Sequence, residues 1–400
     1  MTDPFPTGGT VAVGFEGVRE AFFEAQAKDP GGAQLCVYQR GKPVVDLWAG
    51  YDPENQRPYG EDAIGVLMSC TKGFVAGAVH MLAERGQLDL DAPAARYWPE
   101  FGAHGKDQIT IRQLIAHQGG LMGYDPEMGM DAAALFDWQR SVQGMEEMTP
   151  LWEPGAGAMY HAVTFGVLAG ALIQKIDGRT PGRFIAEEIV APLGLDFWVG
   201  NLPERQEHRR APHFTPPGDA ISIDAMRAFL AGMGIDVEGR LARTYLDTFA
   251  TVEKALPQIN TTRAYRVAEL PAGNGIGNAR ALARYYAALI GEIDGVRLLG
   301  QAAMERARQP QEASRRPPPE FAALSRDGGQ LFGLGFELAS PPRPMLGDGG
   351  FGHSGAGGRL GYANPERGVA VGYACNTMLN NLAGPDLRWV GWNAALEAVV

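Results

Sequence analysis

A serine and a lysine stand three residues apart in the segment Met68 to Gly73, where Ser69 precedes Lys72. Side chains at this spacing on a helix share one face, so the Lys72 amine can reach the Ser69 hydroxyl. The apolar stripe that follows predicts a helix that begins near Ser69 and ends near Gly86. At a helix start, free N–H groups can bind an oxyanion, and the dipole and burial both disfavour a protonated lysine. The pair therefore suits a serine nucleophile with an uncharged lysine as its base.

The same residues also fit a purely structural interpretation, in which Ser69 caps the helix and Lys72 is solvated. Two other segments favour chemistry. Tyr160 follows a Pro-Gly turn and precedes an apolar helix; it is either a packing residue or a proton carrier between serine, lysine and leaving group. The glycine-dense run 350–362 is either a turn cluster or a place where backbone approaches a substrate closely.

Strand patterns lie near both ends of the chain. Residues 34–49 form two apolar runs joined by a polar turn at 40–42, which predicts a β-hairpin. The segments 331–338 and 358–376 are also strand-like, and the turn sequence at 364–368 predicts a second hairpin.

Helical patterns dominate from residue 70 to about residue 300. One helix opens with a capping box at Thr110 and Gln113 and is expected to close at Gly119-Gly120. A second is expected to stop at Gly178, and a third to begin after an N-cap at Asn278. A last helix is predicted in 386–400.

These elements predict an α+β fold, with an antiparallel sheet built from both chain ends, flanked by helices, and a mostly helical region inserted in it. We expect residues 1–85 and 268–400 to form a discontinuous sheet domain. Residues 86–267 would form a helical domain, with the active site at the interface.

Composition narrows the classes of partner. The chain has 400 residues, 45% of them hydrophobic, and a net charge of −11 without a basic cluster. A nucleic-acid or anionic-membrane partner is therefore not expected, because phosphates are bound by clustered Lys and Arg. No segment resembles a membrane span or a signal peptide, and three distant cysteines suit reduced thiols, so we expect a cytoplasmic protein. Without metal-ligand spacing or a phosphate loop, we expect no metal and no cofactor, only a small-molecule substrate; oligomerisation is not implied.

In combination, five segments resemble the serine β-lactamase and penicillin-binding-protein superfamily, and most of all the family VIII carboxylesterases, which share the class C β-lactamase fold. They are residues 69–93, 109–121, 152–173, 273–289 and 352–358.

The resemblance covers nearly the whole chain and implies a β-lactamase/transpeptidase-like fold. By position, Ser69 would be the nucleophile, with Lys72 and Tyr160 as the base network. The amides of Ser69 and Ala356 would form the oxyanion hole. The substrate edge would be lined by His353, Ser354 and Gly355.

Two motifs depart from those of the β-lactamases. Tyr160-His161-Ala162 replaces the usual Tyr-x-Asn, so no side-chain amide is offered to a β-lactam or to Lys72. His353 replaces the lysine of Lys-Thr-Gly, so the cation that grips a substrate carboxylate is missing or pH-dependent. Both changes favour a serine carboxylesterase acting on small, short-chain acyl esters. A β-lactamase, a short-oligomer amidase, an acyltransferase and a non-catalytic ligand-binding module remain alternatives.

The run from Gly352 to Ala356 nearly spells the nucleophile elbow of an α/β-hydrolase, which would make Ser354 the nucleophile. That fold places its histidine after the serine in chain order and a helix directly after the elbow. The last of the seven histidines is His353, and glycines and a strand pattern follow. The elbow is therefore disfavoured.

Overall fold

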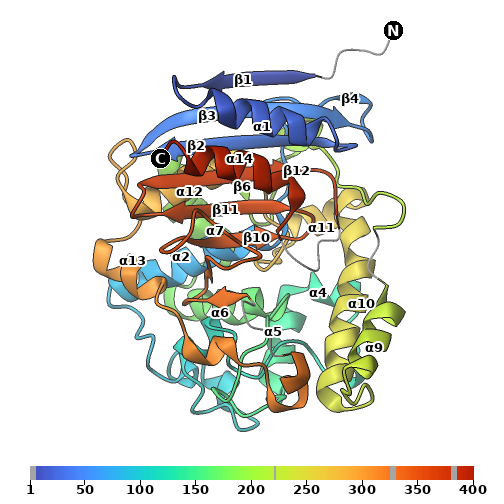
Figure 1. The fold of residues 1–400 in the computed structure, drawn as a ribbon. Helices are drawn as coiled ribbons and strands as arrows, with labels where there is room; N and C mark the ends of the chain where they lie inside the picture. Colours follow the sequence, from blue (N-terminus) through green and yellow to red (C-terminus); the bar gives the residue numbers. More distant parts are fainter. Residues whose placement is uncertain (1–5, 220–221, 325–329, 380–384) are drawn as a thin grey trace.

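A single antiparallel sheet of nine strands organises the computed structural model, which describes residues 6–219, 222–324, 330–379 and 385–400 (Figure 1). The strand order is β1-β3-β2-β12-β11-β10-β9-β8, with β4 paired to β3. The strands are β1 (Thr7–Val11), β2 (Gly32–Gln39), β3 (Lys42–Asp52), β4 (Arg57–Pro58), β8 (Leu331–Phe332), β9 (Glu337–Leu338), β10 (Phe351–Gly355), β11 (Arg359–Asn364) and β12 (Val369–Cys375).

The two chain ends meet where β2 pairs with β12, with Val37 opposite Val371. This confirms the predicted sheet from both termini. Both predicted hairpins are present, β2–β3 and β11–β12. The first turns through Arg40 and Gly41, which both have positive φ (46° and 79°) and so match the twist of the flanking strands.

Helices cover both faces of this sheet (Figure 1). Helices α1 (Glu16–Gln26) and α14 (Leu387–Glu397) pack together on one face, in a core that contains Val37. Helices α2 (Thr71–Glu84) and α12 (Ala279–Ile290) lie on the other, in a core that contains Cys36. Adjacent residues of β2 point to opposite faces because side chains alternate along a strand.

The middle of the chain is mostly helical, as predicted. Its helices are α3 (Ile111–Ile115), α4 (Ala132–Leu135), α5 (Trp138–Glu147), α6 (Thr164–Asp177), α7 (Pro181–Ile185), α8 (Ala191–Leu193), α9 (Ile223–Gly232), α10 (Arg240–Thr261) and α11 (Arg263–Val267). A further helix, α13 (Gln301–Ala307), follows α12. The division into two domains at residues 85 and 268 stays a prediction.

Most of the predicted helix caps are confirmed, and one predicted helix end is wrong. Thr110 and Gln113 form the capping box of α3, Asn278 caps α12, and α6 ends at Gly178, which has a left-handed backbone. The expected end of the first of these helices at Gly119-Gly120 is wrong. Helix α3 stops at Ile115, since His117 already has a left-handed φ of 62° that an α-helix cannot contain.

A second, small sheet was not predicted. It has the order β5-β7-β6 and joins β5 (Gly65–Val66), β7 (Ile276–Gly277) and β6 (Phe197–Trp198). Strands this short carry no readable alternation. Its effect is to fix the segment before α2 against residues two hundred positions later. Among the described residues, no helix combines the length and the apolar character needed to cross a bilayer.

Candidate active site

Ser69 lies on a strained turn at the start of α2. It is the middle residue of the 3₁₀ turn η1 (Met68–Cys70), directly before Thr71. Met68 has a φ of 50°, in the left-handed region of backbone conformation that residues other than glycine rarely occupy. Such a strained conformation persists only where the surrounding structure stabilises it. The Thr71 hydroxyl donates to the Met68 carbonyl (2.6 Å) and accepts from the Gly275 N–H (3.0 Å). This anchoring leaves Ser69 partly exposed between buried neighbours.

Lys72 is fully buried beside Ser69. Its Nζ lies 3.0 Å from the Ser69 Oγ and donates to the carbonyls of Ala162 (2.7 Å) and Ala272 (2.8 Å). Burial lowers the pKa of Lys72 from 10.5 to about 7, against the opposing charge of Glu337. A neutral amine has two N–H donors and one lone pair. With both donors used by carbonyls, the lone pair faces the serine hydroxyl.

Tyr160 completes the cluster from irregular backbone just before α6. Its ring centroid lies 4.9 Å from the Lys72 Nζ, and its hydroxyl is close enough to the Ser69 side chain for Ser69 to lower its pKa. Burial raises the pKa of Tyr160 above its usual value, with the Glu337 charge acting in the same direction. The phenol is therefore neutral at ordinary pH, which suits a proton carrier.

The end of β10 lies against the Ser69 turn. A methyl group on Gly355 would be 2.5 Å from the Leu67 carbonyl oxygen and 3.2 Å from the Met68 Cβ, so only glycine fits this approach. Ala356 follows at the surface. The main-chain N–H groups of Ser69 and Ala356 donate to no other described residue. Both remain available as donors to an oxyanion.

His353 does not supply a cation. It is buried, and burial lowers its pKa from 6.5 to about 4, so the imidazole is neutral at pH 7. Its Nδ1 lies 2.7 Å from the Ser354 carbonyl oxygen, and its ring centroid lies 6.0 Å from that of Tyr160. The sequence allowed either a missing cation or a pH-dependent cation at this position. Because the pKa of His353 is about 4, the cation is missing above about pH 5.

Ser354 is committed to a buried network. Its hydroxyl donates to Glu337 Oε1 (3.0 Å) and accepts from Arg343 Nε (2.8 Å), and its N–H donates to Glu337 Oε2 (2.7 Å). The predicted edge residues thus differ: Gly355 contacts the nucleophile turn and His353 faces Tyr160, whereas the Ser354 side chain is engaged elsewhere.

Sequence reasoning missed Glu337, whose carboxylate is buried within this network. A single acidic residue in the apolar run 331–338 is the signal that could have found it. The expectation that residue 162 offers no side-chain amide to Lys72 is confirmed, but a main-chain partner at this position was missed. Ala162 lacks the amide side chain, but its main-chain carbonyl is a partner of the amine. A carbonyl partner leaves no trace in residue type.

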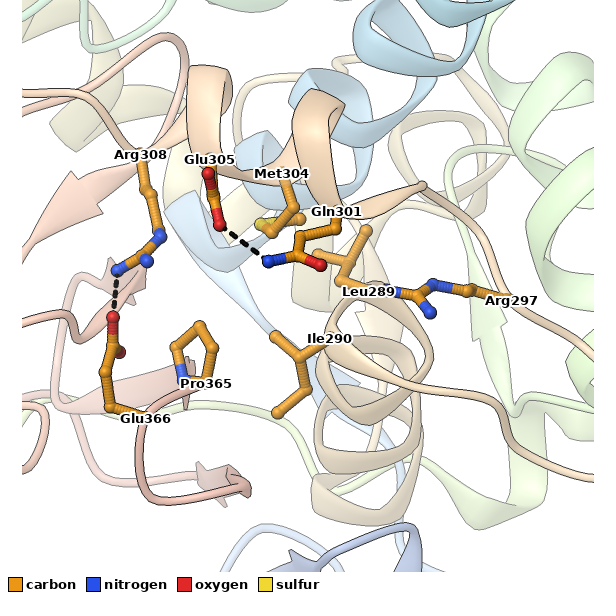
Figure 2. Close-up of a pocket in the computed structure, with 9 residues that line it drawn as sticks. All are labelled: Leu289, Ile290, Arg297, Gln301, Met304, Glu305, Arg308, Pro365 and Glu366. Carbon is orange, nitrogen blue, oxygen red and sulfur yellow. Dashed lines mark hydrogen bonds and ion pairs between the residues drawn. The ribbon is translucent and has the colours of Figure 1, made fainter.

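A surface pocket of about 330 Å³ lies apart from this cluster, between α12, α13 and the β11–β12 turn (Figure 2). Four of its polar side chains pair with one another: Arg308 pairs with Glu366 at 2.6 Å, and Gln301 donates to Glu305 at 3.0 Å. Of the described residues that line it, none belongs to the Ser69 cluster. It is not a candidate for the chemistry above.

Comparisons with known proteins identify relatives that share this fold. A family model described as Beta-lactamase matches residues 19–396. The esterase/beta-lactamase LipL of Mycobacterium tuberculosis is 33% identical over 362 residues, which cover 89% of this chain and 79% of LipL. The crystal structure of a family VIII carboxylesterase is similar with a TM-score of 0.81 and 31% identity, over 99% of this chain and 100% of that one. A penicillin-binding protein homolog from Caulobacter crescentus has a TM-score of 0.81 and 32% identity, with the same coverage.

Proposed function

The chain belongs to the beta-lactamase family, and from this premise we propose that it is a serine carboxylesterase acting on small, uncharged, short-chain acyl esters. It has the β-lactamase/transpeptidase fold and is a serine hydrolase of that family. The proposal rests mainly on one observation. The Lys72 amine donates hydrogen bonds to two carbonyls and lies 3.0 Å from the Ser69 Oγ. The similarity to LipL and to a family VIII carboxylesterase supports it.

In the proposed acylation, the Ser69 Oγ attacks the ester carbonyl while the Lys72 amine accepts the hydroxyl proton. The oxyanion accepts hydrogen bonds from the N–H groups of Ser69 and Ala356. When the tetrahedral intermediate collapses, the C–O bond to the alcohol breaks. Tyr160 gives its proton to the leaving alkoxide and recovers one from the Lys72 ammonium.

Deacylation repeats these steps with water as the nucleophile. Water loses a proton to the Lys72 amine as it attacks the acyl carbonyl, and the same two N–H groups stabilise the oxyanion. The Ser69 oxygen leaves with a proton returned through Tyr160, and the carboxylic acid is released.

An uncharged ester is the favoured substrate because the cations around the site are already committed. Arg343 donates to the Ser354 hydroxyl and to the Pro342 carbonyl, and Arg359 donates to the Ala356 carbonyl. His353 is neutral. Penicillins and D-alanyl peptides carry a carboxylate that needs a free cation, whereas simple esters do not.

Beta-lactam hydrolysis is the second candidate, because LipL is described as an esterase/beta-lactamase. A binding-only role is a weaker candidate function, because binding alone requires no buried amine beside a serine. Cytoplasmic location stays a prediction from the sequence.

The test is hydrolysis of p-nitrophenyl acetate and butyrate by the wild-type protein and by Ser69→Ala. Ester turnover that disappears in Ser69→Ala supports the proposal, and equal rates in both proteins refute it. Nitrocefin turnover ranks the two activities. A fluorophosphonate that fails to label Ser69 in the folded protein would favour the binding-only role.

A further inference from the structure

Tyr160 lies on backbone that is neither helix nor strand, so other groups must fix its position. The N–H groups on both sides of it, at Met159 and His161, donate to one residue, His117. Met159 N–H donates to the His117 carbonyl (3.1 Å), and His161 N–H donates to the His117 Nδ1 (3.2 Å). The His117 ring also packs edge-on against the Tyr160 ring, with centroids 5.2 Å apart.

We propose that His117 is a positioning residue for Tyr160, which it holds in reach of Ser69 by clamping the backbone on either side. The inference rests on the proposed function, because the orientation of Tyr160 matters only if its hydroxyl carries a proton. His117 contacts neither Ser69 nor a reacting atom, and it acts through Tyr160 alone.

The clamp requires an uncharged ring with a defined tautomer. Since Nδ1 accepts a hydrogen bond from a main-chain N–H, the ring proton lies on Nε2. Burial lowers the pKa of His117 well below its usual value, and the nearby His161, Lys72 and His353 act in the same direction. The imidazole therefore keeps its acceptor throughout the neutral range.

The backbone of His117 is suited to this position. Its φ of 62° turns the chain away from α3 and brings both its carbonyl and its ring to the Tyr160 segment. Histidine, asparagine and aspartate occupy this region more readily than other side chains. Phe332 closes the far side, stacked on Tyr160 at 5.9 Å and edge-on to His117 at 4.5 Å. Hydrogen bonds thus fix the main chain on both sides of Tyr160, and packing fixes the position of its ring.

Two substitutions separate the hydrogen bond from the packing. His117→Asn keeps an acceptor near the Nδ1 position and tolerates the left-handed backbone, whereas His117→Phe keeps a ring but has no acceptor. We expect kcat for p-nitrophenyl butyrate to fall about 10- to 100-fold in His117→Phe, as for a misplaced catalytic group, and to be largely retained in His117→Asn. KM should change little in both. If His117→Phe does not fold, His117→Gln, whose acceptor lies one methylene farther out, takes its place.

A double-mutant cycle with Tyr160→Phe distinguishes positioning from general structural support. If His117 acts through Tyr160, His117→Phe should cost little further kcat once the tyrosine hydroxyl is gone. His80→Phe is a matched control, since His80 is another buried imidazole, bonded to the Leu334 carbonyl at 2.8 Å. It should affect the unfolding midpoint and not kcat.

The outcomes separate this inference from the proposed function. Ser69-dependent turnover with an unchanged kcat in His117→Phe, or with fully additive losses in the cycle, overturns the role of His117 alone. The absence of Ser69-dependent turnover in the wild-type protein overturns the proposed function, and the role of His117 with it.

Discussion

The Lys72 amine and the Ser69 hydroxyl lie 3.0 Å apart, where a buried lysine meets a partly exposed serine on a strained turn. The carbonyls of Ala162 and Ala272 occupy the other two directions around the amine. This arrangement stabilises the neutral form of Lys72, which can accept a proton. The Ser69 hydroxyl is the proton donor that faces the lone pair of this amine.

Replacing the proposed base, Lys72, should abolish most of the esterase activity. We expect Lys72→Met to lower kcat for p-nitrophenyl butyrate by about 100- to 10,000-fold, the usual contribution of a general base. Lys106→Met is the matched control. Lys106 is also buried, donates to the Glu146 and Met148 carbonyls, and has a pKa lowered by burial to about 8. Its loss should alter stability and leave kcat in place; a Lys72→Met protein as active as Lys106→Met would exclude lysine as the base.

The pH dependence of the reaction should report Lys72. Because its pKa is about 7 and the neutral amine is the proposed base, kcat/KM should rise about tenfold per pH unit below 7 and level off above it. The raised pKa of Tyr160 predicts no loss of activity up to about pH 9. A pH-rate profile of the wild-type protein checks this; an inflection that persists in Lys72→Met would assign it to another group.

The same lysine should tie stability to pH on the alkaline side. Between pH 7 and 10.5 the folded chain holds Lys72 neutral, whereas the unfolded chain holds it protonated. The unfolded state then binds more protons, so this group's contribution to the free energy of unfolding rises with pH across that window. Urea unfolding at pH 7.5 and 9.5 should show a smaller rise in Lys72→Met than in the wild-type protein. An equal rise in both would contradict the buried neutral amine.

Buried histidines should make the fold sensitive to mild acid. Burial lowers the pKa of five of them from 6.5: to about 4 for His80 and His353, to about 3 for His161 and His213, and well below the usual value for His117. Below pH 6.5 the unfolded chain takes up protons that the folded chain refuses, so stability falls as the pH drops from 6.5 toward 4. Urea unfolding at pH 7.5, 6 and 5 measures the slope. His80→Phe should reduce it, and a slope unaffected by that change would place the sensitivity elsewhere.

Gly355 should be intolerant of a side chain for a reason tied to catalysis. An alanine there would push β10 from the Leu67 carbonyl and separate the N–H of Ala356 from that of Ser69. We expect Gly355→Ala to lower kcat by about 100- to 1,000-fold, the effect of losing one oxyanion donor. Kinetics should be paired with a thermal melt. A folded Gly355→Ala protein with wild-type kcat would rule out Ala356 as a donor.

The charge of the acyl group should decide which esters react. With His353 neutral and Glu337 buried nearby, a carboxylate on the substrate meets no free cation among the side chains described around the site. We expect kcat/KM for p-nitrophenyl butyrate to exceed that for mono-p-nitrophenyl succinate by at least about tenfold. His353→Lys should narrow the ratio. Equal rates in the wild-type protein would point to an unrecognised cation.

Much of the local structure was predictable because its signals lie within a few residues. The hairpin of β2 and β3, the capping box of α3 and the N-cap of α12 each rest on neighbours in the chain. The same holds for the Ser69–Lys72 contact, which one helical turn is enough to create. The early end of α3 was missed because a left-handed His117 gives no sign in the sequence that glycine would give.

The sequence by itself determined that an amine could reach a serine hydroxyl; whether that amine is neutral was decided by the tertiary structure. Lys72 finds its carbonyl partners 90 and 200 residues farther along the chain, and its burial depends on the elements that carry them. The placement of Glu337 and His117 beside Tyr160 arises in the same way. Proton affinity depends on desolvation and on charges within a few ångströms, and those distances exist only once distant segments have packed.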